Sequence, residues 1–190
     1  MFTPNQEQAA QELLRVCRPG GKIGLVNWTP DGFIGHLFKT IGKYVPPPAG
    51  VNPPALWGTE GRLRELFGDG ISELTLNKRF FVFRYRSAEH WLEIFRTYYG
   101  PVLKAFAALD AEGQAGLARD LADLLERFNT GGSETLTVPS EYLEAVATRR
   151  AGVNRKIALN HNATVVRAAS VNRKITANHN ATVVRASQAK

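Results

Sequence analysis

The sequence predicts an α/β body in residues 1–150 and a basic tail in residues 151–190. A helical pattern ends at a Pro-Gly-Gly turn, and a short apolar strand follows this turn directly. Further strand and helix patterns succeed one another through the body, which is typical of an α/β domain. The whole excess of positive charge lies after residue 150, and this separates the tail from the body.

The first unit of the body begins with a helix start. Thr3 can cap the helix, Pro4 suits its first position, and Gln6 completes a Thr-x-x-Gln capping box. Residues at helical spacing then share one apolar face: Ala9, Ala10, Leu13, Leu14 and Cys17. Residues 19–21, Pro-Gly-Gly, end the helix. The strand Lys22–Trp28 follows, and its apolar residues are not confined to alternate positions, which predicts a strand covered on both faces.

The other elements of the body follow from cap residues and apolar patterns. Helices are expected near Phe33–Tyr44, from Thr59 through Phe67, from Ser87 to about Tyr99, and from Asp110 to near Asn129. Strands are expected at Ser72–Tyr85 and Thr135–Arg149.

The tail accounts for the net charge of +7. It holds seven Lys and Arg and no acidic residue, which leaves 17 basic and 17 acidic residues in the body. Its segment Val153–Ala169 returns as Val171–Ser187 with 14 of 17 positions identical. Each copy predicts either a small hairpin, turning at Asn-His-Asn, or a disordered appendage, and we favour the second interpretation.

Residues 13–28 carry a resemblance to a known family. Helix residues LLRVCRPGG, followed by the strand Lys22–Trp28, resemble the helix, turn and fifth strand of class I S-adenosylmethionine-dependent methyltransferases. The strands expected at Ser72–Tyr85 and Thr135–Arg149 stand where the last two strands of that fold belong. Residues 138–144, VPSEYLE, resemble the final strand of a subgroup that methylates small molecules. The resemblance covers residues 1–150 and implies a partial Rossmann-like sheet, with the last strand antiparallel between its neighbours.

The half of the family fold that holds the methyl donor has no counterpart in the sequence. The family binds S-adenosylmethionine with a glycine-rich turn after its first strand and an acidic residue that closes the second. The glycine clusters at residues 20–21, 68–70 and 131–132 do not lie between a strand and a helix in that order, and they suit caps and turns. The resemblance therefore implies the C-terminal half of a methyltransferase, with an incomplete cofactor site and no expected activity alone.

Candidate acceptor-binding residues lie where the strand Lys22–Trp28 ends. Ligands of open α/β sheets bind at the carboxyl ends of strands. This predicts a pocket for a small-molecule acceptor formed by Asn27, Trp28, Thr29, Phe33 and Trp57, to which His36 could be added. Alternatively, Trp28 and Phe33 belong to the core and His36 lies on a helix surface. Because alignment of donor and acceptor can suffice for transfer, the sequence identifies no catalytic residue.

The sequence also allows functions other than methyl transfer. A basic tail could bind polyanions through phosphate contacts, although it lacks aromatic residues for base stacking. A truncated reading frame without activity is a third interpretation. His161 and His179 lack the Cys or carboxylate partners of a metal site, and the aromatic residues around His90 favour a core role.

The single Cys17, the absence of a long apolar run and a start unlike a signal peptide predict a cytoplasmic protein outside the membrane. Without the missing strands, one edge of the strand Lys22–Trp28 would be open, and open edges recruit other chains. The sequence therefore also predicts self-association through that edge.

Overall fold

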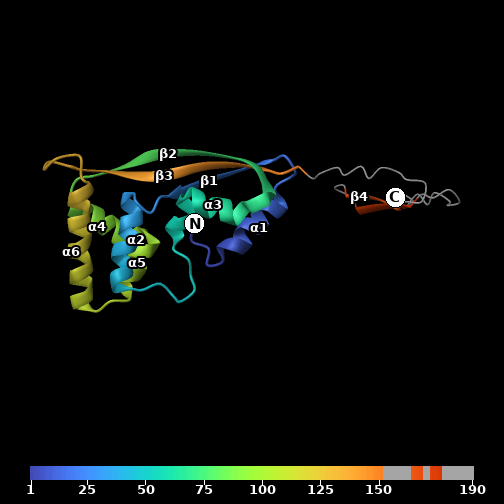
Figure 1. The fold of residues 1–190 in the computed structure, drawn as a ribbon. Helices are drawn as coiled ribbons and strands as arrows, with labels where there is room; N and C mark the ends of the chain where they lie inside the picture. Colours follow the sequence, from blue (N-terminus) through green and yellow to red (C-terminus); the bar gives the residue numbers. More distant parts are fainter. Residues whose placement is uncertain (152–163, 169–171, 177–190) are drawn as a thin grey trace. The chain divides into compact units, whose positions relative to one another are not determined.

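The structure, a computed structural model, describes residues 1–151, 164–168 and 172–176 (Figure 1). The chain divides into two units, Met1–Arg149 and Arg150–Lys190, and each is described by itself. None of the helices in the described part of the chain combines the length and apolar composition that crossing a membrane requires.

The first unit is a mixed α/β domain built on a three-stranded sheet with the order β1-β3-β2. The strands are β1 (Lys22–Trp28), β2 (Ile71–Tyr85) and β3 (Leu136–Arg149). Strand β3 runs antiparallel to both neighbours, with Trp28 opposite Tyr142 and Tyr85 opposite Leu136. Strands β1 and β2 are therefore parallel to each other, and all three strand predictions are confirmed to within one residue.

Six α-helices lie on one side of this sheet in Figure 1: α1 (Gln6–Val16), α2 (Phe33–Tyr44), α3 (Glu60–Phe67), α4 (Ala88–Tyr98), α5 (Gly100–Ala107) and α6 (Ala111–Phe128). Short 3₁₀ turns η1 (Pro54–Gly58) and η2 (Gly68–Gly70) flank α3. The predicted caps are confirmed: the side chains of Thr59, Ser87 and Asp110 accept hydrogen bonds from the backbone N–H groups of Arg62, His90 and Gly113. Helix α5 was not predicted from the sequence. Gly100-Pro101 suggests a break, although proline is well suited to a first helical turn.

The predicted cap of the first helix is wrong. The cap is Asn5, whose side chain accepts a hydrogen bond of 2.9 Å from the backbone N–H of Gln8. Gln6 cannot complete a capping box with Thr3 because its side chain is fully buried and has other partners. Its amide donates to the carbonyl of Pro53 at 3.2 Å and accepts from Arg62 at 2.9 Å.

Strand β3 buries opposite faces in its two halves. The buried side chains are Leu136, Val138 and Ser140 in the first half, and Leu143, Ala145 and Ala147 in the second. Pairing with both neighbours stays in register across this change. The change of face therefore follows from the cumulative twist of a long strand rather than from a bulge.

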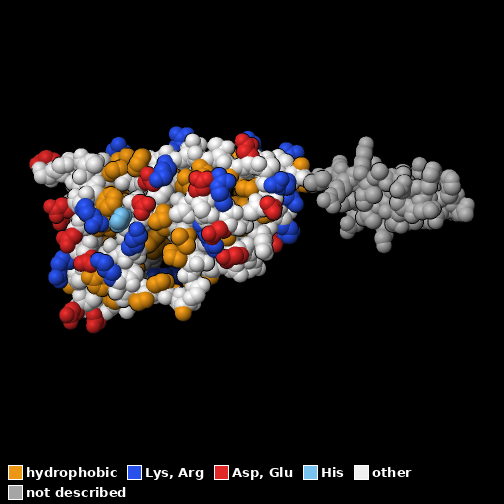
Figure 2. Space-filling model, viewed as in Figure 1, with side chains coloured by type: hydrophobic (Ala, Val, Ile, Leu, Met, Phe, Trp, Pro, Cys, Tyr) orange, Lys and Arg blue, Asp and Glu red, His pale blue; other side chains and the backbone are white. Residues whose placement is uncertain are grey.

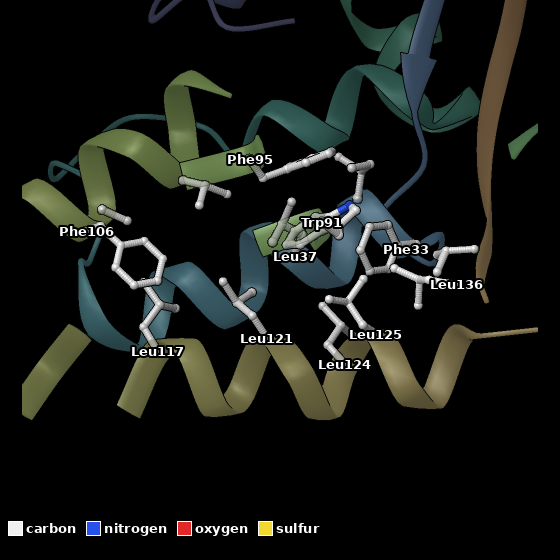
Figure 3. Close-up of a cluster of buried hydrophobic side chains, with 14 residues drawn as sticks. Phe33, Leu37, Trp91, Phe95, Phe106, Leu117, Leu121, Leu124, Leu125 and Leu136 are labelled. Atoms are coloured by element: carbon white, nitrogen blue, oxygen red, sulfur yellow. The ribbon is translucent and has the colours of Figure 1, made fainter. Parts of the chain in front are cut away.

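Two hydrophobic cores result from this twist. The first core joins α2, α4, α5 and α6 to the start of β3, and Figure 3 shows its side chains Phe33, Leu37, Trp91, Phe95, Phe106, Leu117, Leu121, Leu124, Leu125 and Leu136. The second core joins α1, α3 and η1 to the sheet and contains Ala10, Ile23, Trp57, Leu63, Phe67, Ile71, Leu143, Ala145 and Ala147. The helices of the first core gather at one end of the sheet, and α1 and α3 lie toward the other (Figure 1).

The prediction that β1 is covered on both faces is wrong. Ile23 and Asn27 are each 6% exposed, whereas Val26 on the opposite face is 65% exposed. The reason is the division into two cores: α1 and α3 cover one face of β1, and the helices of the first core lie beyond its carboxyl end.

Within the second unit, β4 (Thr164–Ala168) pairs antiparallel with β5 (Asn172–Thr176). The two strands come from different copies of the repeat, whereas the hairpin alternative, the less favoured of the two interpretations, placed a hairpin within each copy. The expected Asn-His-Asn turns, with His161 and His179, lie outside the described residues. Of the seven basic residues on which the polyanion hypothesis depends, Arg167, Arg173 and Lys174 lie in β4 and β5, and the other four lie outside the described residues.

Deletion of residues 151–190 is expected to leave the first unit folded. The described members of both hydrophobic cores all come from residues 1–149, and the division of the chain falls at the same point. A chain ending at residue 150 should therefore melt within about 4 °C of the full chain, a shift that corresponds to roughly 1 kcal/mol. Differential scanning calorimetry measures this, and a larger drop in Tm would show that the tail packs on the body.

Candidate functional site at the carboxyl end of β1

Three consecutive residues, Asn27, Trp28 and Thr29, end β1 and direct their side chains into different surroundings. Because side chains alternate along a strand, Asn27 lies on the face covered by α1 and α3, and Trp28 on the opposite face. Thr29 is 3% exposed and begins the turn into α2. Each of the three lines a different cavity of about 340 Å³. The predicted site is therefore a group of hollows around one strand end rather than a single pocket.

The turn after β1 is held firmly against β3. The backbone N–H of Thr29 donates to the carbonyl of Glu141 at 3.2 Å, and the Thr29 hydroxyl accepts from the N–H of Gly32 at 3.2 Å. The N–H of Ile34 donates to the hydroxyl of Ser140, which is fully buried, at 3.3 Å. These bonds fix where α2 begins relative to the sheet.

Aromatic rings surround Trp28. Its ring centroid lies 6.3 Å from Phe81, 5.9 Å from Phe83 and 6.0 Å from Tyr142. The adjacent cavity is lined by Val26, Trp28, Phe81 and Tyr142, and Phe81 is 50% exposed. This hollow offers ring faces and edges to a flat, largely apolar ligand.

A second cavity lies on the opposite face, beside α1. Its lining includes Leu25 and Asn27 from β1, Leu13 and Val16 from α1, and Trp57 from η1. The indole N–H of Trp57 is buried and makes no hydrogen bond within the described residues. Apolar side chains also reach the surface in the middle of this unit, between α2 and α3, where Figure 2 shows them among interspersed acidic and basic groups.

The third cavity is polar and lies beyond the end of β1. Thr29, Asp31, Thr59, Glu60 and Lys78 contribute to its lining. The ammonium of Lys78 lies 3.0 Å from the carboxylate of Glu141, and the Thr59 hydroxyl donates to the carbonyl of Leu56 at 2.8 Å. Two of its polar groups therefore already have partners within the protein.

Two predicted residues do not reach these cavities. Phe33 is fully buried in the first core, where its ring contacts Phe83, Trp91 and Phe128, as the core alternative predicted. His36 packs on the ring of Phe128 at 5.3 Å. Partial burial, together with Lys39 and Arg127, lowers the pKa of His36, so its imidazole is neutral at physiological pH.

The structure adds Val26, Phe81 and Tyr142 to the residues predicted from the sequence. Their proximity to Trp28 depends on strand pairing, which places Tyr142 opposite Trp28 and Phe81 opposite Ser140. The cluster of aromatic residues at Phe80–Tyr85 was the available signal. Among the described residues, no group of three His, Cys, Asp or Glu side chains could hold a metal ion.

No protein-family model matches the chain. Over 154 residues the chain is 38% identical to an uncharacterized protein of Mycobacterium tuberculosis, Rv1405c, a match covering 79% of this chain and 55% of the relative. An uncharacterized protein of Mycobacterium bovis matches equally well. A further uncharacterized M. tuberculosis protein, Rv1403c, is 37% identical over 145 residues, which is 75% of this chain and 48% of that protein. The chain therefore spans about half the length of the curated relatives it matches.

Proposed function

We propose that this chain forms the acceptor-binding half of a class I S-adenosylmethionine-dependent methyltransferase that acts on a small molecule. The observation that carries the proposal is the sheet order β1-β3-β2, with a reversed strand between two parallel ones. The family resemblance of residues 1–150 implied this arrangement for the last three strands of a Rossmann-like sheet. Agreement in both strand order and strand direction is a stricter criterion than the presence of the Arg-Pro-Gly-Gly turn alone.

The position of the helices also supports an acceptor-binding role. Helices α2, α4, α5 and α6 gather where the parallel strands β1 and β2 end, which is the ligand side of an open α/β sheet (Figure 1). In this proposal Trp28, Phe81 and Tyr142 hold an apolar part of the acceptor. The bonded turn from Thr29 to Gly32 keeps this surface rigid, so the contribution of the chain is positioning and exclusion of water.

The residues of this chain do not fit the methyl donor. A glycine with positive φ allows close approach of backbone to a nucleotide when it follows a strand and opens a helix. Among the residues that the structure describes, the glycines with positive φ are Gly20, Gly50, Gly68 and Gly132, and none of these four occupies that position. Gly20 precedes β1, and Gly68 ends α3. The methyl donor would therefore be bound by a polypeptide similar to the part of the relatives that lies outside the matched region.

The chain alone is expected to bind S-adenosylmethionine with a Kd weaker than about 100 μM, because tighter binding requires roughly 5.5 kcal/mol from contacts it does not contain. Titration calorimetry measures this. Full-length Rv1405c, titrated in parallel, is expected to bind the donor. If the full-length relative showed no donor binding, the methyltransferase proposal would be overturned. Tight binding by the chain alone would contradict the division into two halves.

A further inference from the structure

We propose that the free edge of β1, with the groove beside α1, is a docking surface for a β-strand and a covering helix. The partner is a polypeptide similar to the part of the M. tuberculosis relatives that lies outside the matched region. Only this choice of partner rests on the proposed function. The docking surface itself is argued from the backbone, the groove and the charges below.

The backbone of β1 presents an unpaired row of hydrogen-bonding groups. The carbonyl of Gly21 accepts from the N–H of Arg149 at 2.8 Å, and the N–H of Thr29 donates to Glu141 at 3.2 Å. In an antiparallel ladder, alternate residues bond to the same partner. Gly21, Thr29 and the odd-numbered residues between them therefore bond to β3. The even-numbered residues Lys22, Gly24 and Val26 point their N–H and C=O groups away from β3, where the structure describes no other strand. At the carboxyl end of β1 the backbone carbonyl of Trp28 packs against Gly58 of η1, so the free edge ends before Trp28.

Apolar side chains flank this edge on both faces of the sheet. On one face, Leu25 from β1 and Leu13 and Val16 from α1 line the cavity of about 340 Å³ that Asn27 and Trp57 also line. Val16 is 66% exposed, and Val26 on the opposite face is 65% exposed. A strand paired with β1 would extend the sheet beside Val26. A helix beside α1 would fill the groove and cover Val16.

The outer edge of β2 is built differently. Charged residues occur along its length: Glu73, Lys78, Arg79 and Arg84. Lys78 and Arg79 form ion pairs with Glu141 and Glu144 of β3, at 3.0 and 3.3 Å. Charged side chains are a common device against edge-to-edge pairing. Strand β1 has one charge, on Lys22 at its start, so the sheet is protected at β2 and open at β1.

The length of the relatives favours a strand and helix from a larger protein over a second copy of this chain. The match covers 55% and 48% of the two M. tuberculosis proteins, so about half of each has no counterpart here. That length suffices for several strand–helix units, each of which needs roughly 30 residues. The groove continues the layer of α1, which is the position of a helix that would cover the next strand.

The test uses the full chain, labelled with ¹⁵N, and the part of Rv1405c outside the match, expressed as a separate polypeptide. A stable complex is expected, in which hydrogen exchange of the Gly24 and Val26 amides slows at least about tenfold. The amides of Ile23, Leu25 and Asn27 should already be protected in the chain alone, because they bond to β3. If the separate half does not stay in solution, a fusion of both parts in the order of Rv1405c is measured instead.

Three outcomes would overturn the inference. The chain could remain alone, a complex could leave the even-numbered amides unchanged, or these amides could become protected in the chain alone as its concentration rises. The last result would identify a second copy as the partner. Titration of the assembly with S-adenosylmethionine separates this inference from the proposed function. Edge protection without donor binding would overturn only the function, and donor binding without edge protection would overturn only the docking.

Two variants locate the contact. Val16→Lys places a charge in the groove and is expected to weaken the complex at least about tenfold, since it would bury an unpaired charge. Tyr98→Lys is the matched control, because Tyr98 is also the last residue of a helix, is 77% exposed and lies outside the groove. Val26→Pro removes one edge N–H, a change that edge strands tolerate, and should also weaken the complex. Equal affinities for all three variants and the unaltered chain would contradict the proposed surface.

Discussion

Replacement of Trp91 by alanine is expected to lower the free energy of unfolding by about 3–5 kcal/mol, the range observed for large aromatic side chains removed from a core. Trp91 is fully buried, with an exposed fraction of 0%. Its ring stacks on Phe95 with centroids 3.9 Å apart and meets the edge of Phe33 at 5.7 Å (Figure 3). Alanine would leave a cavity between α4 and α2. Urea unfolding followed by circular dichroism measures the loss of unfolding free energy.

Trp91→Phe should cost less than the difference in side-chain size suggests. The indole N–H of Trp91 is buried without a hydrogen-bond partner in the described residues. An unsatisfied buried donor costs about 1–3 kcal/mol, and phenylalanine removes it. Tyr98→Ala, on the same helix but at a position 77% exposed, should change stability by less than about 0.5 kcal/mol. If Trp91→Ala and Tyr98→Ala had similar effects, the first core would not be what holds the helices at this end of the sheet.

The sequence predicted the strands and most helix starts because the signals are local. Ser87 and Asp110 cap the helices that follow them, and each needs only the next three residues to do so. The capping box expected at Thr3 failed because Gln6 bonds to Pro53 and Arg62, which are distant in the sequence. A local motif therefore predicts correctly only where no tertiary contact competes for the same side chain.

Which face of the sheet is buried at each end could not be predicted from local signals. The exposed position of Val26 and the buried position of Ile23 depend on which helices reach each end of a twisted sheet. The end of β1 could be chosen from the sequence as a candidate site, because a strand end marks the ligand side in many α/β folds. That a ligand binds there stays a prediction. Asn27, Trp28 and Thr29 do line cavities, but the ring partners of Trp28 come from β2 and β3 and depend on the pairing register.

Alanine in place of Gly35 is expected to destabilise the protein by roughly 1–3 kcal/mol or more, because it overfills a tightly packed site. A Cβ atom at this position in α2 would lie 2.3 Å from the carbonyl oxygen of Thr29 and 2.4 Å from that of Pro30. Both are backbone atoms of the turn that leaves β1, so no side-chain rotation relieves the overlap. The turn is also bonded to Glu141, and α2 would have to move away from the candidate site.

Gly42→Ala in the same helix is the matched control, and it is expected to have the opposite sign. A Cβ atom at Gly42 would meet no other atom within 4 Å, and alanine is favoured over glycine inside a helix by roughly 0.5–1 kcal/mol. The two substitutions share the same chemistry and the same helix, so their difference isolates the contact between α2 and the turn after β1. Urea unfolding of both variants measures it. If Gly35→Ala were as stable as Gly42→Ala, the turn would be able to yield, and the proposal of a rigid acceptor surface around Trp28 would lose its physical basis.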